Sequence, residues 1–274
     1  MEPYWDLIKR IITESDLVME ILDARLVELS RNEEVEKLVK EINRPIIFVV
    51  NKSDLVSKDS IKNQIENMKN EREVVYVSAK NKRARKLLYY TIKKVFKQHG
   101  KRAPIILGRY DKKPEHREAR ADIVVGVLGY PNTGKSSIIN LLAHKQKAKV
   151  SKKPGTTHGI HWIKATDEIK LIDSPGVIPL KKDDELRYGL IGARDTEKLH
   201  NPEIVASAVI KLFLRNNKRA FESFYGIEIK SKEPSEILSN LAEQKSHLLK
   251  AGNLDLYRTS SMIVRDWQQG KLRL

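Results

Sequence analysis

The sequence predicts an α/β fold, with a doubly wound, mostly parallel sheet followed by a small, all-helical C-terminal domain. Over residues 1–180, short apolar runs alternate with segments whose apolar residues recur at helical spacing, which is the pattern of βαβ units. From about residue 180 onward the spacing is helical only. We therefore expect one domain over residues 1–180 and a helical domain over residues 181–274.

The individual elements follow from apolar runs, helical spacing and breakers. In the first domain we expect helices at residues 1–14, 31–42, 58–69, 82–97 and 135–142, and strands at 17–22, 46–50, 74–77, 123–128, 158–164 and 168–172. Residues 99–121 are charged and contain two prolines, which predicts a linker. In the second domain we expect helices at residues 201–216, 220–225, 233–250 and 255–268.

Composition limits the possible classes of protein. The 274 residues include no cysteine, which excludes disulfides and thiolate metal sites and suits a reducing, cytoplasmic environment. No apolar run approaches the roughly 20 residues of a bilayer-spanning helix, and no signal-peptide pattern is visible, so we expect no membrane association. The formal net charge of +16 points to a polyanionic partner, most often nucleic acid. A Lys-rich proteome is the alternative explanation.

A phosphate-binding loop is expected between the strand at 123–128 and the next helix. Residues 129–136 read Gly-Tyr-Pro-Asn-Thr-Gly-Lys-Ser, in which the glycines let backbone N–H groups face phosphate oxygens. Lys135 would supply charge to the β- and γ-phosphates, and the Ser136 hydroxyl would bind Mg²⁺. Asn132, Thr133, Gly134 and Ser137 complete the expected phosphate contacts.

A guanine-reading segment is expected after the strand at 46–50. Residues 51–54 read Asn-Lys-Ser-Asp. The Asp54 carboxylate can accept two hydrogen bonds from guanine that adenine cannot offer. The Asn51 side chain can bond the base edge and fix the phosphate loop, and the Lys52 stem can pack on the ring. After the next strand, Ser78, Ala79 and Lys80 should direct the Ala79 N–H to the guanine O6.

A second magnesium-binding segment is expected at the end of the strand at 168–172. Residues 173–176 read Asp-Ser-Pro-Gly. Asp173 would hold Mg²⁺ through a water molecule, and the Gly176 N–H would meet the γ-phosphate. A threonine from the preceding segment can complete the metal shell. We choose Thr157 for that position, although Thr156 is an alternative.

These motifs occur in an unusual order, because the guanine reader precedes the phosphate loop by about eighty residues. In that order the chain resembles the circularly permuted P-loop GTPases of the YlqF/YawG type, including Asp23-Ala24-Arg25 after the first strand. The resemblance covers residues 1 to about 180. It implies Mg²⁺-dependent hydrolysis of GTP to GDP and phosphate, as a switch in assembly of the large ribosomal subunit. The amino-terminal histidine of the bacterial relatives is absent here. A tRNA-linked or protein-effector role, and nucleotide binding without turnover, are the alternatives.

The groups that would speed hydrolysis are less evident. Lys135, Asn132, Thr157 and Gly176 are the candidate catalytic residues. Many signalling GTPases carry a water-orienting glutamine after the glycine at 176, and Val177 stands there instead, so unassisted hydrolysis should be slow. Asn132 matches an asparagine that binds K⁺ in related potassium-activated GTPases, while a loop-stabilising amide is the alternative. His158 and His161 are more consistent with surface residues of a strand.

The C-terminal domain is the expected output of the switch. The segment after residue 176 would respond to the γ-phosphate and leads directly to the helical domain, so its rearrangement should reorient that domain. Basic residues that could meet ribosomal RNA phosphates lie at Lys145, Lys147, Lys149, Lys152, Lys153, Lys181, Lys182, Arg215, Lys218 and Arg219. We expect a monomer whose partners are ribosomal RNA and a precursor of the large ribosomal subunit.

Overall fold

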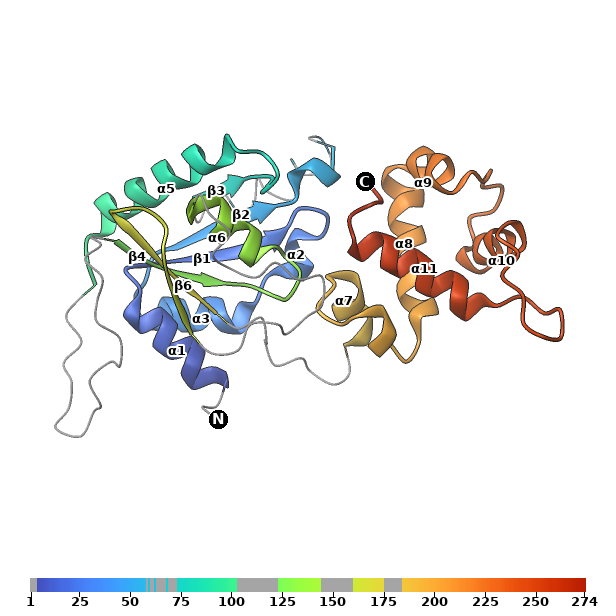
Figure 1. Cartoon of the computed structure of the whole chain (residues 1–274), viewed down its shortest axis with the longest axis horizontal. Helices are drawn as coiled ribbons and strands as arrows, with labels where there is room; N and C mark the ends of the chain where they lie inside the picture. The colour runs from blue at the N-terminus through green and yellow to red at the C-terminus, as the bar shows by residue number, and fades with distance from the viewer. Residues whose placement is uncertain are drawn as a thin grey trace.

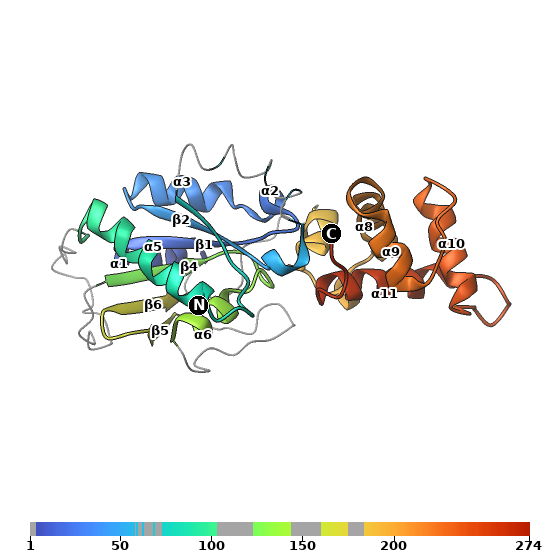
Figure 2. The ribbon, with the colours of Figure 1, turned by 90° about the horizontal axis from the view of Figure 1, so that it is seen from above.

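The protein consists of a sheet region and a helical region that lie end to end (Figure 1). The computed structural model describes residues 4–57, 59, 62, 68, 73–102, 123–143, 160–174 and 184–274. We call the described residues up to 174 the sheet region and residues 184–274 the helical region. Figure 2, turned by 90°, shows the same separation along the long axis.

The sheet has six strands in the order β3-β2-β1-β4-β6-β5. Only β5 runs antiparallel, against β6. The chain moves outward in one direction from β1 to β3 and in the other from β4, so the strand order reverses between β1 and β4. In such sheets, ligands bind at the carboxyl ends of the strands near this reversal. The strands are β1 Leu17–Asp23, β2 Ile46–Asn51, β3 Glu73–Tyr76, β4 Ile123–Leu128, β5 His161–Lys164 and β6 Ile169–Asp173.

Helices cover both faces of the sheet, as the predicted α/β class requires. On one face, α1 (Tyr4–Glu14) and α3 (Glu33–Glu41) pack on Val18 and neighbouring apolar residues, and the short α2 (Val27–Ser30) lies beside them. On the other face, α5 (Ala84–His99) and α6 (Lys135–Ala143) pack on Met19 and its neighbours. Alternate residues of β1 thus enter opposite cores, which explains its continuous apolar run. The predicted α/β fold with a doubly wound, mostly parallel sheet is confirmed.

The helical region has an apolar core of its own, built around Phe213, Phe221 and Trp267. Leu26 and Tyr130 of the sheet region belong to the same cluster of buried residues, so the two regions share a core. The elements are α7 Glu185–Leu190, η2 Thr196–Lys198, α8 Pro202–Asn216, α9 Lys218–Tyr225, α10 Pro234–Gln244 and α11 Leu256–Gln268.

Several predicted boundaries differ from the structure. The predicted end of the helix at 233–250 was wrong. Helix α10 ends at Gln244, and Ser246 takes a left-handed φ of 52°. Leu248 and Leu254 then form an isolated antiparallel bridge. The helix expected from residue 31 begins at Glu33, because the Asn32 side chain caps it. Most of the linker at 99–121 and of the helix at 58–69 lies outside the described residues. Among those described, no helix is long and apolar enough to cross a bilayer.

Candidate nucleotide-binding site

The predicted motifs meet at one edge of the sheet. β1 ends at Asp23, β2 at Asn51 and β6 at Asp173, while the phosphate loop follows β4. Asp23 pairs with Asn51 in register, and Asp173 pairs with Val127. Because these strands are parallel, their carboxyl ends lie together. Residues from four separate strands therefore surround one site.

The phosphate loop requires its two glycines for steric reasons. At Gly129 the φ is 137°, and an added Cβ would lie 2.6 Å from the Ile21 carbonyl oxygen. At Gly134 the φ is 101°, and a Cβ would lie 2.2 Å from Asn51 Nδ2. A side chain at Gly129 would clash with backbone, one at Gly134 would displace the Asn51 amide, and both φ values lie in the region that favours glycine. The loop thus packs directly on β1 and on the guanine-reading segment.

Lys135 is buried at the start of α6, immediately before Ser136. Its Nζ donates to the carbonyl oxygens of Gly129 at 2.6 Å and of Tyr130 at 2.9 Å. Burial lowers the pKa of Lys135 to about 8, against the opposing effect of Asp173. Burial also raises the pKa of Asp173 to about 6, although Lys135 and His161 act in the opposite direction. Neutral carbonyls compensate the ammonium only in part, so a phosphate would be a better partner.

The donor set fits magnesium only together with a nucleotide. Ser136 and Asp173 would supply a hydroxyl and a carboxylate, which are hard oxygen ligands. Across the part of the chain that the structure describes, no group of three His, Asp or Glu side chains could hold a metal ion by itself. Magnesium at such sites takes its remaining ligands from phosphate oxygens and water. Thr156, Thr157 and Gly176 lie outside the described residues.

The guanine-reading segment is tied to the phosphate loop as the sequence predicts. Asn51 Nδ2 donates to the Thr133 carbonyl oxygen at 2.9 Å, and Asn51 Oδ1 accepts from the Ala79 N–H at 3.1 Å. We expected the Ala79 N–H to meet the guanine O6, and in this structure it donates its hydrogen bond to Asn51 Oδ1. Thr133 itself is buried, and its hydroxyl donates to the Tyr130 carbonyl oxygen at 2.9 Å.

The Asp54 carboxylate lies near the surface with exchangeable partners. Its Oδ1 accepts from the Ser78 hydroxyl at 2.8 Å, and its Oδ2 pairs with Lys80 Nζ at 2.8 Å. The Asp54 side chain is 29% exposed and that of Lys80 is 75% exposed. Burial would raise the pKa of Asp54, but the hydrogen bonds from Lys80 and Ser78 lower it. The carboxylate is therefore ionised and able to accept hydrogen bonds from a guanine base.

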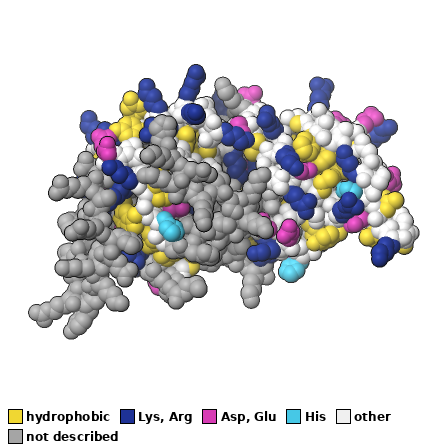
Figure 3. All heavy atoms as spheres, viewed as in Figure 1, with side chains coloured by type: hydrophobic (Ala, Val, Ile, Leu, Met, Phe, Trp, Pro, Cys, Tyr) yellow, Lys and Arg dark blue, Asp and Glu magenta, His cyan; other side chains and the backbone are white. Residues whose placement is uncertain are grey.

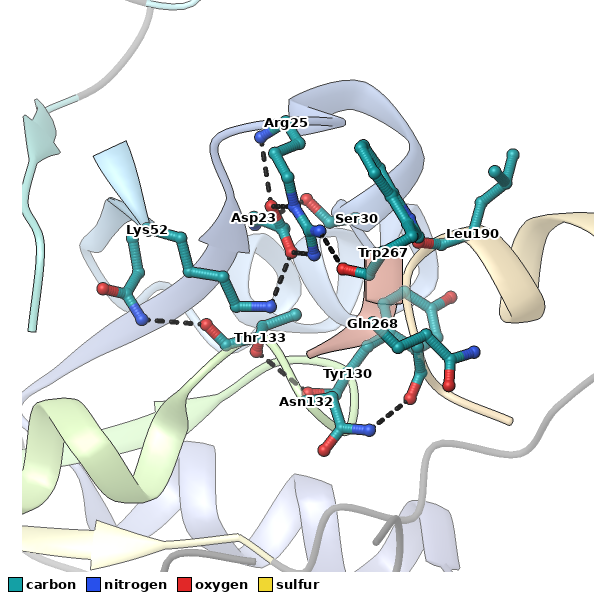
Figure 4. Close-up of polar contacts among 12 residues, drawn as sticks. Asp23, Arg25, Ser30, Lys52, Tyr130, Asn132, Thr133, Leu190, Trp267 and Gln268 are labelled. Carbon is teal, nitrogen blue, oxygen red and sulfur yellow. Dashed lines mark hydrogen bonds and ion pairs between the residues drawn. The ribbon is translucent and has the colours of Figure 1, made fainter. Parts of the chain in front are cut away.

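Lys52 makes a contact that the sequence did not suggest. Its Nζ donates to Asp23 Oδ2 at 2.7 Å (Figure 4), while the packing of its stem on the guanine ring stays a prediction. Lys52 also adopts a left-handed φ of 62°. Such a conformation is disfavoured for lysine, so the surrounding contacts must hold it. Lys52 thereby links the guanine reader to the end of β1.

Asp23 and Arg25 form a buried ion pair that reaches the helical region. Arg25 donates to both carboxylate oxygens of Asp23, at 3.0 and 2.7 Å, and both side chains are 1% exposed. The Arg25 guanidinium stacks over the Trp267 ring at 4.1 Å and donates to the Trp267 carbonyl oxygen. Burial would raise the pKa of Asp23, but Arg25 and Lys52 hold it well below its ordinary value. Only the Asp-Ala-Arg sequence at the end of β1 could have indicated this contact.

Further contacts join the helical region to the site. Asn132 Nδ2 donates to the Gly192 carbonyl oxygen at 2.6 Å, which ties the phosphate loop to the segment after α7. The Leu274 N–H donates to the carbonyl oxygen of Leu55 at 2.8 Å, and Leu55 is the last residue of the 3₁₀ turn η1 (Ser53–Leu55), which contains Asp54. The helical region therefore contacts the phosphate loop, the guanine reader and the end of β1.

This chain is similar in sequence to known proteins over nearly its whole length. The family model for the 50S ribosome-binding GTPase matches residues 124–248. An uncharacterized GTP-binding protein of Methanocaldococcus jannaschii is 34% identical over 98% of this chain and 66% of its own length. Nucleolar GTP-binding protein 2 of Saccharomyces cerevisiae is 31% identical over 98% of this chain and 52% of its own.

The same similarity extends to solved structures. YlqF of T. maritima in its GNP-bound form superposes with a TM-score of 0.60 at 23% identity, over 98% of this chain and 95% of that one. The GDP-bound form gives a TM-score of 0.61. At this sequence identity, the structural similarity shows the fold alone. The chain spans about half to two-thirds of the length of the M. jannaschii and S. cerevisiae relatives.

Proposed function

Since the chain belongs to the circularly permuted GTPases of the YlqF/YawG type, we propose that it hydrolyses GTP to GDP and phosphate as a switch in assembly of the large ribosomal subunit. The observation that carries this proposal is the contact of the helical region with three nucleotide-site loops, through Asn132–Gly192, Asp23–Arg25–Trp267 and Leu55–Leu274. A change in any of these loops on nucleotide exchange would be transmitted to the helices.

The proposed chemistry uses the residues already placed. Lys135 would leave the loop carbonyls and bind the β- and γ-phosphates, while Ser136 and Asp173 would hold Mg²⁺. The ion would neutralise charge on the phosphate oxygens. Thr157 would complete the Mg²⁺ shell, and the Gly176 N–H would meet the γ-phosphate. Asn132 would bind K⁺ beside the phosphates, and hydrolysis would be slow without an activator because Val177 cannot orient water.

The proposed partner is a precursor of the large ribosomal subunit, contacted through its RNA. The net charge of +16 supports an anionic partner. The description of the matching family and the nucleolar name of the yeast relative support the ribosome over other polyanions. Residues 181–274 would form the ribosome-binding domain, and the chain would act as a cytoplasmic monomer.

Co-sedimentation tests this proposal. We measure how much of the full chain pellets with large ribosomal subunits in GDP and in a non-hydrolysable GTP analogue. The amount in the two nucleotides should differ at least tenfold. Large subunits should also accelerate GTP hydrolysis, whereas isolated small subunits serve as the control. Stimulation by tRNA in place of large subunits would favour a tRNA-linked role and contradict the proposal.

A further inference from the structure

The exposed face of α5 carries an unusual concentration of positive charge. Residues 81–102 contain nine Lys and Arg residues and no Asp or Glu. The opposite face of α5 is apolar and buries Leu88, Ile92 and Val95 against the sheet. Within α5 itself, Lys86, Lys93, Lys94 and Lys97 are exposed on its outer side, away from the helical region (Figure 1).

One line of side chains runs along this outer side. Lys86, Tyr90, Lys94 and Lys97 follow one another at intervals of three or four residues, which places them on one helix face. We call these four residues the α5 ridge. It spans about 16 Å at the 1.5 Å rise of an α-helix. In Figure 3, Lys and Arg side chains and hydrophobic side chains lie together at the upper left edge, over α5.

Protein carboxylates pair with Lys94 inside the ridge and with the adjacent Lys93, and among the described residues they leave the lysines at the two ends of the ridge without an ion pair. Lys94 pairs with Glu73 at 2.8 Å, and the adjacent Lys93 pairs with Glu168 at 3.1 Å. Within the described ranges, Lys86 and Lys97 take part in no ion pair. Lys86 and Lys97 therefore lie about 16 Å apart along the helix axis, with an aromatic ring between them.

Tyr90 is the feature that points to a particular ligand. Its side chain is among the most exposed large hydrophobic groups of the described residues, at 57%. Lys86 Nζ lies 5.8 Å from its ring centre, and the Tyr89 ring contacts it edge-on at 5.8 Å. These contacts support the ring and leave its outer face open. An exposed aromatic ring between lysines offers stacking to a base and charge to the neighbouring phosphates.

We infer that the α5 ridge binds RNA at an unpaired nucleotide, with the base stacked on Tyr90 and with backbone phosphates on either side of that nucleotide on Lys86 and Lys97. An acidic protein surface could also use the lysines and the ring, but an unpaired base offers a flat face that stacks on the ring and brings its own phosphates to the lysines, so we commit to RNA. This inference rests on the proposed function in that the RNA is ribosomal. It adds an RNA contact on the sheet region, on helix α5, which begins four residues after Lys80.

Fluorescence anisotropy with the full chain tests the inference. The probes are a fluorescein-labelled RNA stem-loop with an unpaired loop and the same stem as a blunt duplex. Tyr90→Ala should weaken stem-loop binding about tenfold, in line with base stacking on aromatic rings, and should change duplex binding less than twofold. Tyr90→Phe should bind as the wild type does, because the ring is retained.

The lysines are tested with a charge-matched control. Lys86→Gln with Lys97→Gln should reduce the slope of log affinity against log salt by about 1.4, since each single-strand phosphate contact contributes about 0.7. Lys37→Gln with Lys40→Gln, on the exposed side of α3, should leave affinity and slope unchanged. All variants should bind a fluorescent GDP analogue with wild-type affinity.

The outcomes separate this inference from the proposed function. Wild-type RNA binding by Tyr90→Ala and by the Lys86/Lys97 variant would overturn the ridge as an RNA site, as would absence of RNA binding by the wild type. If the ridge variants lost ribosome association while their RNA binding stayed unchanged, the ridge would be a site for a protein partner, and the inference of an RNA site would be overturned. Nucleotide-independent ribosome association with the predicted Tyr90 effect would contradict the switch and leave the ridge standing.

Discussion

Lys135 at the phosphate loop and Arg25 at the junction with α11 are both buried cations, and they are held very differently. Two neutral backbone carbonyls hold Lys135. A carboxylate, a carbonyl and the Trp267 ring hold Arg25. Asp54 resembles Lys135, since its partners are the hydroxyl of Ser78 and the exposed Lys80.

The difference separates ligand-binding groups from coupling groups. Neutral or solvent-exposed partners cost little to exchange, so Lys135 and Asp54 are free to take up phosphate and guanine. A buried ion pair is costly to break, because the remaining charge is left without compensation. Lys52 lies between the two classes, since it belongs to the guanine reader and is bonded to Asp23. We expect substitutions in the two classes to affect different properties.

The largest effect should come from the junction. Asp23→Ala removes the carboxylate that compensates Arg25 and Lys52, so the free energy of unfolding should fall by about 3–5 kcal/mol. Glu168→Ala is the control, because Glu168 pairs with Lys93 at the solvent-exposed surface and its loss should lower the free energy of unfolding much less. Urea unfolding of the two variants measures both values. Similar losses in both would remove the distinction between the junction and the surface.

Lys135→Ala should affect binding and leave stability intact. The ammonium would make charge-assisted bonds to phosphate worth about 3 kcal/mol, so affinity for GTP should fall about 100-fold. The melting temperature should stay within about 2 °C of the wild type or rise, because a buried charge is removed. Titration with a fluorescent GTP analogue and thermal unfolding test this pair of expectations. A destabilised variant with normal affinity would place Lys135 among the structural groups.

Asp54 belongs with Lys135 to the ligand-binding groups, and Asp54→Asn should alter the nucleotide specificity. An amide can donate where the carboxylate accepts, so affinity for GTP should fall about tenfold or more relative to xanthosine triphosphate. Stability should change little, since Asp54 lies near the surface. Competition between the two nucleotides for the protein gives the ratio. An unchanged ratio would remove Asp54 from the base site.

Asn132→Ala should give the smallest effect and a mixed one. It breaks the bond to Gly192, which should cost about 1 kcal/mol of stability. Hydrolysis of GTP should be faster in KCl than in NaCl at equal ionic strength, and the variant should lose that difference. Steady-state phosphate release in the two salts measures it. Equal wild-type rates would exclude potassium activation.

Local sequence determined what could be predicted. The strand at Ile123–Leu128 and the loop after it follow from an apolar run and a glycine pattern, and the structure has the strand with those bounds. The Asn51 contact to the phosphate loop was also foreseen. Each of these features depends on residues that are close in sequence or on a known motif.

Long-range contacts escaped prediction. Arg25 and Trp267 are separated by 242 residues, and no local pattern pairs them. The end of α10 depends on the left-handed conformation of Ser246, and a serine in the sequence does not predict that conformation. The sequence suggested a separate helical domain, whereas Leu26 and Tyr130 extend its core into the sheet region. The boundary at residue 180 stays a prediction, because residues 175–183 lie outside those described.

The central claim is that the helical region senses the nucleotide through its contacts with the site. Hydrogen exchange of the full chain, with GDP and with a non-hydrolysable GTP analogue, tests this most directly. We predict that amide protection in α7 and α11 differs between the two nucleotides, and that Arg25→Lys abolishes the difference in α11 while nucleotide affinity is kept. Changes confined to the loops at the sheet edge, with identical protection throughout α7 and α11, would contradict the account.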